Sequence, residues 1–125
     1  MGFTTYKKHS ILYISKNRND NDLLRFEGKV QVLGRNMRKP AYILKDDGAS
    51  DYFIDRAKAE ELIREGARTR DAGWMEVRVA RNNTMHEGLQ KRQLVQVDLR
   101  IQGYRMKEWF TVMNLDDYDI ILGKA

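Results

Sequence analysis

The stretch from Leu94 to Gly103, LVQVDLRIQG, alternates between apolar and polar residues along nearly its whole length. Successive side chains of a β-strand point to opposite faces, so this period of two predicts a strand with one buried face and one solvated face. The predicted buried face consists of Val95, Val97, Leu99 and Ile101. Such a strand needs neighbouring strands and a second apolar layer to cover it, which favours a β-rich domain.

Most of the remaining chain has the same character. Further strands are predicted at 26–32, 38–44, 74–80, 104–114 and 118–123. The first two flank a turn-like stretch at Gly34–Arg38, and we expect them to form a hairpin. A second, projecting hairpin is expected where Asn82 and Asn83 interrupt the pattern, because asparagine tolerates positive backbone angles.

One helix is expected, over the sequence DRAKAEELIREGAR that begins at Asp55. An aspartate at the start suits an N-cap, and Gly66 near the end suits a helix terminus. The apolar positions of this amphipathic segment are Ala57, Ala59, Leu62 and Ile63. The sequence therefore predicts a mostly β fold with one short helix.

Composition limits the class of protein. A chain of 125 residues that is 42% hydrophobic can bury one modest core, so one domain is expected. The absence of cysteine removes disulfides and thiol chemistry and suits the cytoplasm, and two histidines are a poor metal set, so neither a metal nor a cofactor is predicted. No apolar run of about 18 residues exists to cross a membrane. The net charge of +5 favours anionic partners only mildly.

The N-terminal part differs from the rest in composition. Residues 15–22, SKNRNDND, are rich in asparagine and aspartate, which is typical of a loop or hinge. We therefore divide the chain into an N-terminal arm and polar linker, residues 1–22, and a main domain, residues 23–125.

Two short motifs carry the chemistry. The first is ILKDDGAS, Ile43–Ser50, an apolar strand followed by an Asp-x-Gly-Ala-Ser turn. The second is LDDYDIILG, Leu115–Gly123. Together and in this order they resemble the active-site turn and the closing segment of retropepsin-like aspartic proteases, as found in the polyproteins of gypsy-type LTR retrotransposons or in domesticated derivatives. The resemblance extends over about 26–123 and implies an acid-protease half-barrel that is completed as a homodimer.

The resemblance assigns roles residue by residue. Asp46 matches the catalytic aspartate. The active-site turn consists of Asp47, Gly48, Ala49 and Ser50, and the segment that packs beneath it consists of Ile121, Leu122 and Gly123. The projecting hairpin, from about 79 to 89, would be the flap over the substrate, with its tip at Ala80, Arg81, Asn82, Asn83, Thr84 and Met85.

The implied reaction is hydrolysis of peptide bonds in an extended peptide, which in such elements is the polyprotein, within the cytoplasm and inside retrotransposon particles. Without a metal or a covalent nucleophile, this reaction needs one group to activate water and another to protonate the product. Two carboxylates that share a proton supply both. One chain contributes only Asp46, because Asp47 is adjacent in extended backbone and points the opposite way, so a homodimer with two-fold symmetry is implied.

Four features depart from the family pattern. One is the flap, which reads Ala80-Arg81-Asn82-Asn83 where related retrotransposon proteins often show Ala-Asp-Gly. Asp47 stands where a serine or threonine hydroxyl is usual, and Lys45 stands where an apolar residue is common. An ionised Asp47 can only accept hydrogen bonds, so dimer formation and activity are predicted to strengthen in acid. The family also continues past the final glycine into a dimer-forming tail, and a strand at SILYIS, Ser10–Ser15, is a hypothetical replacement.

Two alternative functions follow from the same sequence. Lys45 and Asp47 are compatible with a catalytically silent protease-like domain that binds peptides or self-associates. Basic clusters at Arg35–Lys39 and Gln90–Gln93 are compatible with a β-domain that binds nucleic acid, although no RNA-binding motif accompanies them.

Overall fold

The computed structural model describes residues 10–15, 24–35, 37–46, 48–81 and 84–123. In these ranges the chain forms eight strands and one helix, which are β1 (Ser10–Ser15), β2 (Leu24–Gln31), β3 (Lys39–Lys45), β4 (Tyr52–Asp55), α2 (Arg56–Arg64), β5 (Thr69–Arg81), β6 (Thr84–Ile101), β7 (Tyr104–Met113) and β8 (Ile120–Leu122). The prediction of a mostly β fold with one short helix is confirmed for this part of the chain. None of its helices is long and apolar enough to cross a membrane.

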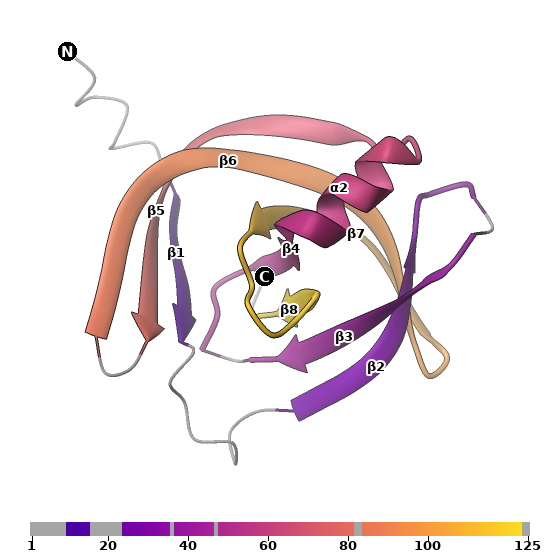
Figure 1. The fold of residues 1–125 in the computed structure, drawn as a ribbon, viewed down its shortest axis with the longest axis horizontal. Helices are drawn as coiled ribbons and strands as arrows, with labels where there is room; N and C mark the ends of the chain where they lie inside the picture. The colour runs from indigo at the N-terminus through magenta and orange to yellow at the C-terminus, as the bar shows by residue number, and fades with distance from the viewer. Residues whose placement is uncertain (1–9, 16–23, 36, 47, 82–83, 124–125) are drawn as a thin grey trace.

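Six of the strands, which are labelled in Figure 1, form a closed barrel. Their order is β6, β2, β3, β8, β4 and β7, and the pairing of β7 with β6 completes the circle. The predicted hairpin of 26–32 with 38–44 is present as the antiparallel pair β2 and β3. The barrel therefore closes within a single chain.

The core follows the alternation predicted for 94–103. Val95, Val97 and Leu99 on β6 are buried, and they pack in one cluster with residues of β2, β3, β4, α2, β7 and β8. One detail differs from the prediction of a solvated opposite face. The Asp98 side chain is completely buried, because arginine side chains of β6 and β7 cover it.

The helix begins and ends as its sequence predicts. The Oδ2 atom of Asp55 accepts a hydrogen bond from the backbone N–H of Ala57 at 3.2 Å, which is an N-cap. Gly66 follows the last turn with a φ of +100°, a backbone conformation that favours glycine. Ala59 and Leu62 are buried, and α2 packs against β4 and β7. The remaining predicted apolar positions are less covered, with Ile63 half-buried and Ala57 exposed.

The hairpin of β5 and β6 is longer than predicted. Its ladder runs from the Thr69–Val95 pair to the Arg81–Thr84 pair, with an irregularity between Asp71 and Trp74. In this region the sequence predicts strands only at 74–80 and 94–103, because residues 84–93 show no regular alternation of apolar side chains. In the structure the backbone of 84–93 is nevertheless paired with β5.

The N-terminal strand belongs to the same sheet as the domain. β1 pairs in parallel with β5 of its own chain, from the Ser10–Met75 pair to the Ser15–Ala80 pair, and the two lie side by side in Figure 1. In the structure of the single chain, this strand thus takes its partner from within the chain. Its hypothetical role in dimer pairing stays a prediction.

Candidate active site

The turn that carries Asp46 directly follows β3. The backbone N–H of Ala49 donates to the Asp46 carbonyl at 3.0 Å, and the N–H of Gly48 donates to its side-chain Oδ1 at 2.9 Å. These bonds close the chain into a tight turn and fix the carboxylate relative to the backbone. The Asp46 side chain has no exposed surface in the single chain. Asp47 lies outside the described residues.

The last strand, β8, is inserted between the two strands that flank this turn. Ile121 is the partner of Leu44 on β3 in parallel register and of Phe53 on β4 in antiparallel register. The backbone N–H of Asp46 donates to the carbonyl of Leu122 at 2.9 Å. The two sequence motifs, distant along the chain, therefore meet at the turn.

Gly123 supports the turn through close backbone packing. Its N–H donates to the carbonyl of Asp51 at 3.0 Å. A Cβ atom at this position would lie 2.4 Å from the carbonyl oxygen of Ala49 and 2.5 Å from that of Asp51, distances that real Cβ atoms essentially never show. Any other residue would displace either β8 or the turn, so the requirement for glycine is steric.

The other predicted turn residues have different surroundings. Ala49 is buried in a second apolar cluster, which connects the turn to β3, β4, β5, β7 and β8. Gly48 is half-buried and Ser50 is exposed. The cluster includes Met75 and Val77 from β5, so the long hairpin and the turn share one apolar cluster.

A polar network that the sequence does not predict lies beside the turn. The NH2 group of Arg92 on β6 lies 2.5 Å from Oδ2 of Asp51 and its Nε donates to the hydroxyl of Thr111 at 3.2 Å. That hydroxyl donates in turn to Asp51 at 3.2 Å. Only the position of Asp51 immediately after the motif offered a signal, since nothing in the sequence connects it with the other two residues.

The predicted flap residues lie at the free end of the long hairpin. Ala80 and Arg81 end β5, Thr84 and Met85 begin β6, and the pairs are Ala80 with Met85 and Arg81 with Thr84. Asn82 and Asn83, at the predicted tip, lie outside the described residues. The predicted hairpin is present, and its role as a flap stays a prediction.

The described part of the chain contains no group of three or more His, Cys, Asp or Glu side chains that could hold a metal ion.

Comparison with known proteins assigns no family. No protein-family model matches the sequence, and no curated protein matches it. Among solved structures, the chain is similar to the crystal structure of Lpg0085, a protein with unknown function (DUF785) from Legionella pneumophila subsp. pneumophila str. Philadelphia 1. The two are 12% identical with a TM-score of 0.40, over 79% of this chain and 81% of the other. A likeness at this level carries no conclusion about activity.

Proposed function

We propose that this chain is a retropepsin-like aspartic endopeptidase that hydrolyses peptide bonds as a homodimer. The carrying observation is the insertion of β8 beneath the Asp46 turn. The bond from the Asp46 N–H to the Leu122 carbonyl and the steric fit of Gly123 hold the turn from below. Both motifs that resemble the protease family take part in this arrangement, which supports a common role for them.

A fixed carboxylate is what the proposed chemistry requires. A catalytic group is effective when its position is set by surrounding contacts before the substrate arrives. The N–H of Gly48 restrains one oxygen of Asp46, and the strands on both sides restrain its backbone. In the proposed dimer, the Asp46 carboxylates of two chains meet at the two-fold axis, share one proton and activate a water between them.

Dimer formation in this proposal includes a rearrangement around the turn. The Asp46 side chain is completely covered in the single chain, whereas water and substrate must reach it in an active enzyme. Met75 and Val77 of the long hairpin share an apolar cluster with Ala49 of the turn. Movement of this hairpin on association with a second chain opens the carboxylate to an extended peptide, and the hairpin then closes over that peptide as a flap. The substrate class that the family resemblance suggests is a retrotransposon polyprotein in the cytoplasm.

A second candidate function is a catalytically silent domain that self-associates or binds peptides. The specific observation that favours it is the complete burial of Asp46. If the turn never opens, the Asp46 carboxylate has only a structural role. Lys45, which immediately precedes Asp46, is compatible with such a role.

Cleavage of a mixed peptide library between about pH 4 and 7.5 separates the two candidates, since a carboxylate pair that shares a proton works best in acid. The variants are Asp46→Asn and, as a matched control, Asp117→Asn, which changes an exposed carboxylate in the loop before β8. We expect cleavage that is strongest in acid, absent in Asp46→Asn and retained in Asp117→Asn. A folded dimer without cleavage at any pH overturns the endopeptidase and favours the silent domain.

A further inference from the structure

Three cationic side chains stand in one row across the outside of the barrel. Lys29 on β2 is the direct partner of Arg100 on β6, and Arg100 is the direct partner of Arg105 on β7. Directly paired residues of antiparallel strands share a face of the sheet. Like charges in such positions repel one another, and the contacts of Arg100 and Arg105 with Asp98 offset only part of that repulsion.

A single buried carboxylate lies beside the row. Asp98 accepts hydrogen bonds from Arg105 at 3.1 Å and 2.7 Å, and the Arg100 guanidinium lies 3.7 Å from it. The hydrogen bonds from Arg105 lower the pKa of Asp98 below its ordinary value, although burial opposes this effect. One carboxylate offsets only part of the charge of three cations, and the row keeps a positive surplus.

The positive surface continues along β5 and β7. In the strand register, Lys107 on β7 lies opposite Asp98 and Arg70 on β5 lies opposite Leu94. Arg68 immediately precedes β5, and its carbonyl accepts a hydrogen bond from the backbone N–H of Gln96. We call this surface the basic face and define it by Lys29, Arg68, Arg70, Arg100, Arg105 and Lys107.

Carboxylates are sparse on the basic face. The exposed acidic residues Asp71 and Glu108 alternate to the other side of their strands, where their ladder partners are Gln93 and Val97. Among the residues that the structure describes, no carboxylate forms an ion pair with Lys29, Arg68, Arg70 or Lys107. These four side chains are exposed, and although Lys107 faces Asp98 and Arg70 lies against Trp109, their charges can also interact with a partner.

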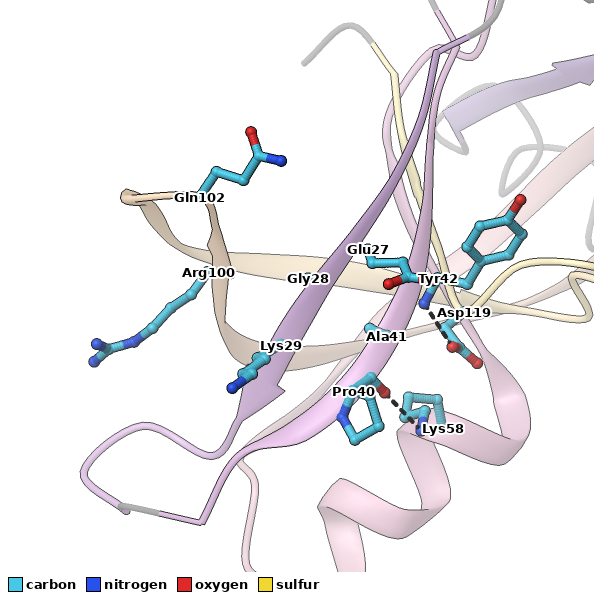
Figure 2. A pocket seen from close by; sticks show the side chains of 10 residues that line it. All are labelled: Glu27, Gly28, Lys29, Pro40, Ala41, Tyr42, Lys58, Arg100, Gln102 and Asp119. Carbon is cyan, nitrogen blue, oxygen red and sulfur yellow. Dashed lines mark hydrogen bonds between the residues drawn. The ribbon is translucent and has the colours of Figure 1, made fainter.

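Aromatic rings accompany the cations. The Arg70 guanidinium lies 4.5 Å from the centroid of the Trp109 ring, which holds this cation in place. A groove of about 750 Å³ borders the row and is lined by Lys29, Arg100 and Tyr42, as Figure 2 shows. Tyr42 is 41% exposed and stacks on Tyr118 with a centroid distance of 5.2 Å.

The groove is less positive than the rest of the face. Lys58 contributes a further cation, and its Nζ donates to the carbonyl of Pro40 at 3.3 Å. Glu27 and Asp119 also line the groove, and the Asp119 carboxylate is occupied by the backbone N–H of Tyr42 at 2.8 Å. Its chemistry is therefore mixed, with cations toward the row and an exposed ring at Tyr42 (Figure 2).

We propose that the basic face and its groove bind single-stranded nucleic acid. The phosphates would lie along the row and Lys107, where they offset the repulsion between like charges, and an unpaired base would stack on Tyr42. A positive surface together with exposed aromatic rings is the usual arrangement for binding single strands without sequence preference. An acidic peptide would satisfy the cations but has no aromatic base to stack on the exposed ring.

The cations of this site do not belong to the two basic clusters of the sequence, Arg35–Lys39 and Gln90–Gln93. Lys39 lies within 3.9 Å of Glu61 and 3.7 Å of Glu65, and Arg92 is occupied by Asp51. The proposed site instead gathers single basic residues from four strands. It shares no residue with the Asp46 turn, so it goes beyond the proposed protease activity.

The test is fluorescence anisotropy of a labelled oligouridine RNA of about 20 nucleotides, titrated with the full chain at about 50 to 200 mM salt. The variant is Lys29→Glu with Lys107→Glu, two exposed side chains outside the core. The matched control is Lys91→Glu, an exposed lysine that alternates to the other face of β6. We expect the double variant to bind the RNA at least about tenfold more weakly, and the slope of log affinity against log salt concentration to be smaller by about one or more. The control should lose much less affinity.

A second variant tests the aromatic part. Tyr42→Leu keeps the charge of the groove and removes the ring, and we expect it to weaken binding about threefold to tenfold or more. Equal losses in the double variant and the Lys91→Glu control overturn the proposal, as does equally tight binding of duplex RNA or equal competition by a polyglutamate peptide of matched charge. Asp46→Asn should bind RNA as the wild type does, which keeps this test separate from that of the endopeptidase.

Discussion

Arg92 and Asp51 tie the base of the long hairpin to the end of the Asp46 turn. The NH2 group of Arg92 on β6 lies 2.5 Å from Oδ2 of Asp51, and the buried hydroxyl of Thr111 on β7 contacts both. The two charged side chains are only 21% and 19% exposed. Three segments distant in sequence are thus joined at one point beside the candidate catalytic carboxylate.

We expect Arg92→Met to lower the free energy of unfolding by about 1 to 3 kcal/mol, because it leaves a largely buried carboxylate without its cation. Urea denaturation monitored by tryptophan fluorescence measures the change. Arg68→Met is the control, since Arg68 is exposed immediately before β5 and its loss should cost no more than about 0.5 kcal/mol. Equal stability of the two variants would contradict a structural role for the Arg92–Asp51 pair.

Gly123→Ala should lower the free energy of unfolding by at least about 2 kcal/mol and reduce peptide cleavage with it, because the new methyl group meets two backbone carbonyls of the turn. Gly88→Ala on β6 is the matched control. Nothing lies within 4 Å of a Cβ at that position, so its effect should stay within about 1 kcal/mol. Thermal unfolding of both variants gives the comparison, and a Gly123→Ala protein as stable as the control would show that β8 does not press on the turn.

The Asp98 carboxylate should make stability depend on pH in acid. Its pKa is lower in the folded state than in the unfolded chain, mainly because of the hydrogen bonds from Arg105. A group of this kind contributes stability that is present above its unfolded pKa, near 3.8, and is lost as the pH falls through its folded pKa.

Asp98→Asn should therefore be less stable than the wild type at neutral pH, and the difference should narrow below about pH 4. Urea midpoints measured across this range provide the comparison. Asp117→Asn, which alters an exposed carboxylate, serves as the control and should follow the wild type. A constant difference between Asp98→Asn and wild type down to strong acid would rule out the linkage.

Self-association should be tighter in acid by roughly a factor of ten, or about 1.4 kcal/mol, because Asp47 adds an extra carboxylate to each side of the proposed dimer axis. Sedimentation velocity at about pH 5 and pH 7.5 measures it. Asp47→Ser should remove most of the pH effect by restoring a hydroxyl at this position. Equal dimer affinity of the wild type at both pH values would refute the expectation.

Much of the fold follows from local patterns. The alternation in β6 predicts its buried face, because that strand lies within the barrel and needs one apolar side. The helix is predicted at both ends because Asp55 and Gly66 act through their own backbone neighbours. Resemblance to a known family is what brings the DDGAS and DYDIILG motifs together in advance, since period and propensity carry no information on which distant segments meet.

The remaining features depend on tertiary neighbours. Asp98 occupies a position that alternates outward, and only the arginines that fold over it bury it. The Arg92–Asp51 contact joins residues 41 positions apart, and the row of Lys29, Arg100 and Arg105 exists only through strand register. A basic residue that is isolated in the sequence gives no sign that it will lie beside two others.

The strand β8 lies between β3 and β4 in the barrel, and this position has a consequence for synthesis on the ribosome. Its neighbours β3 and β4 precede it by a long stretch of chain, as the contact of Tyr42 with Asp119, 77 residues apart, illustrates. Until residues 120–123 have left the exit tunnel, both neighbours present unpaired edges and the nascent domain cannot close. The turn that carries Asp46 is thus completed only at the end of translation of this segment.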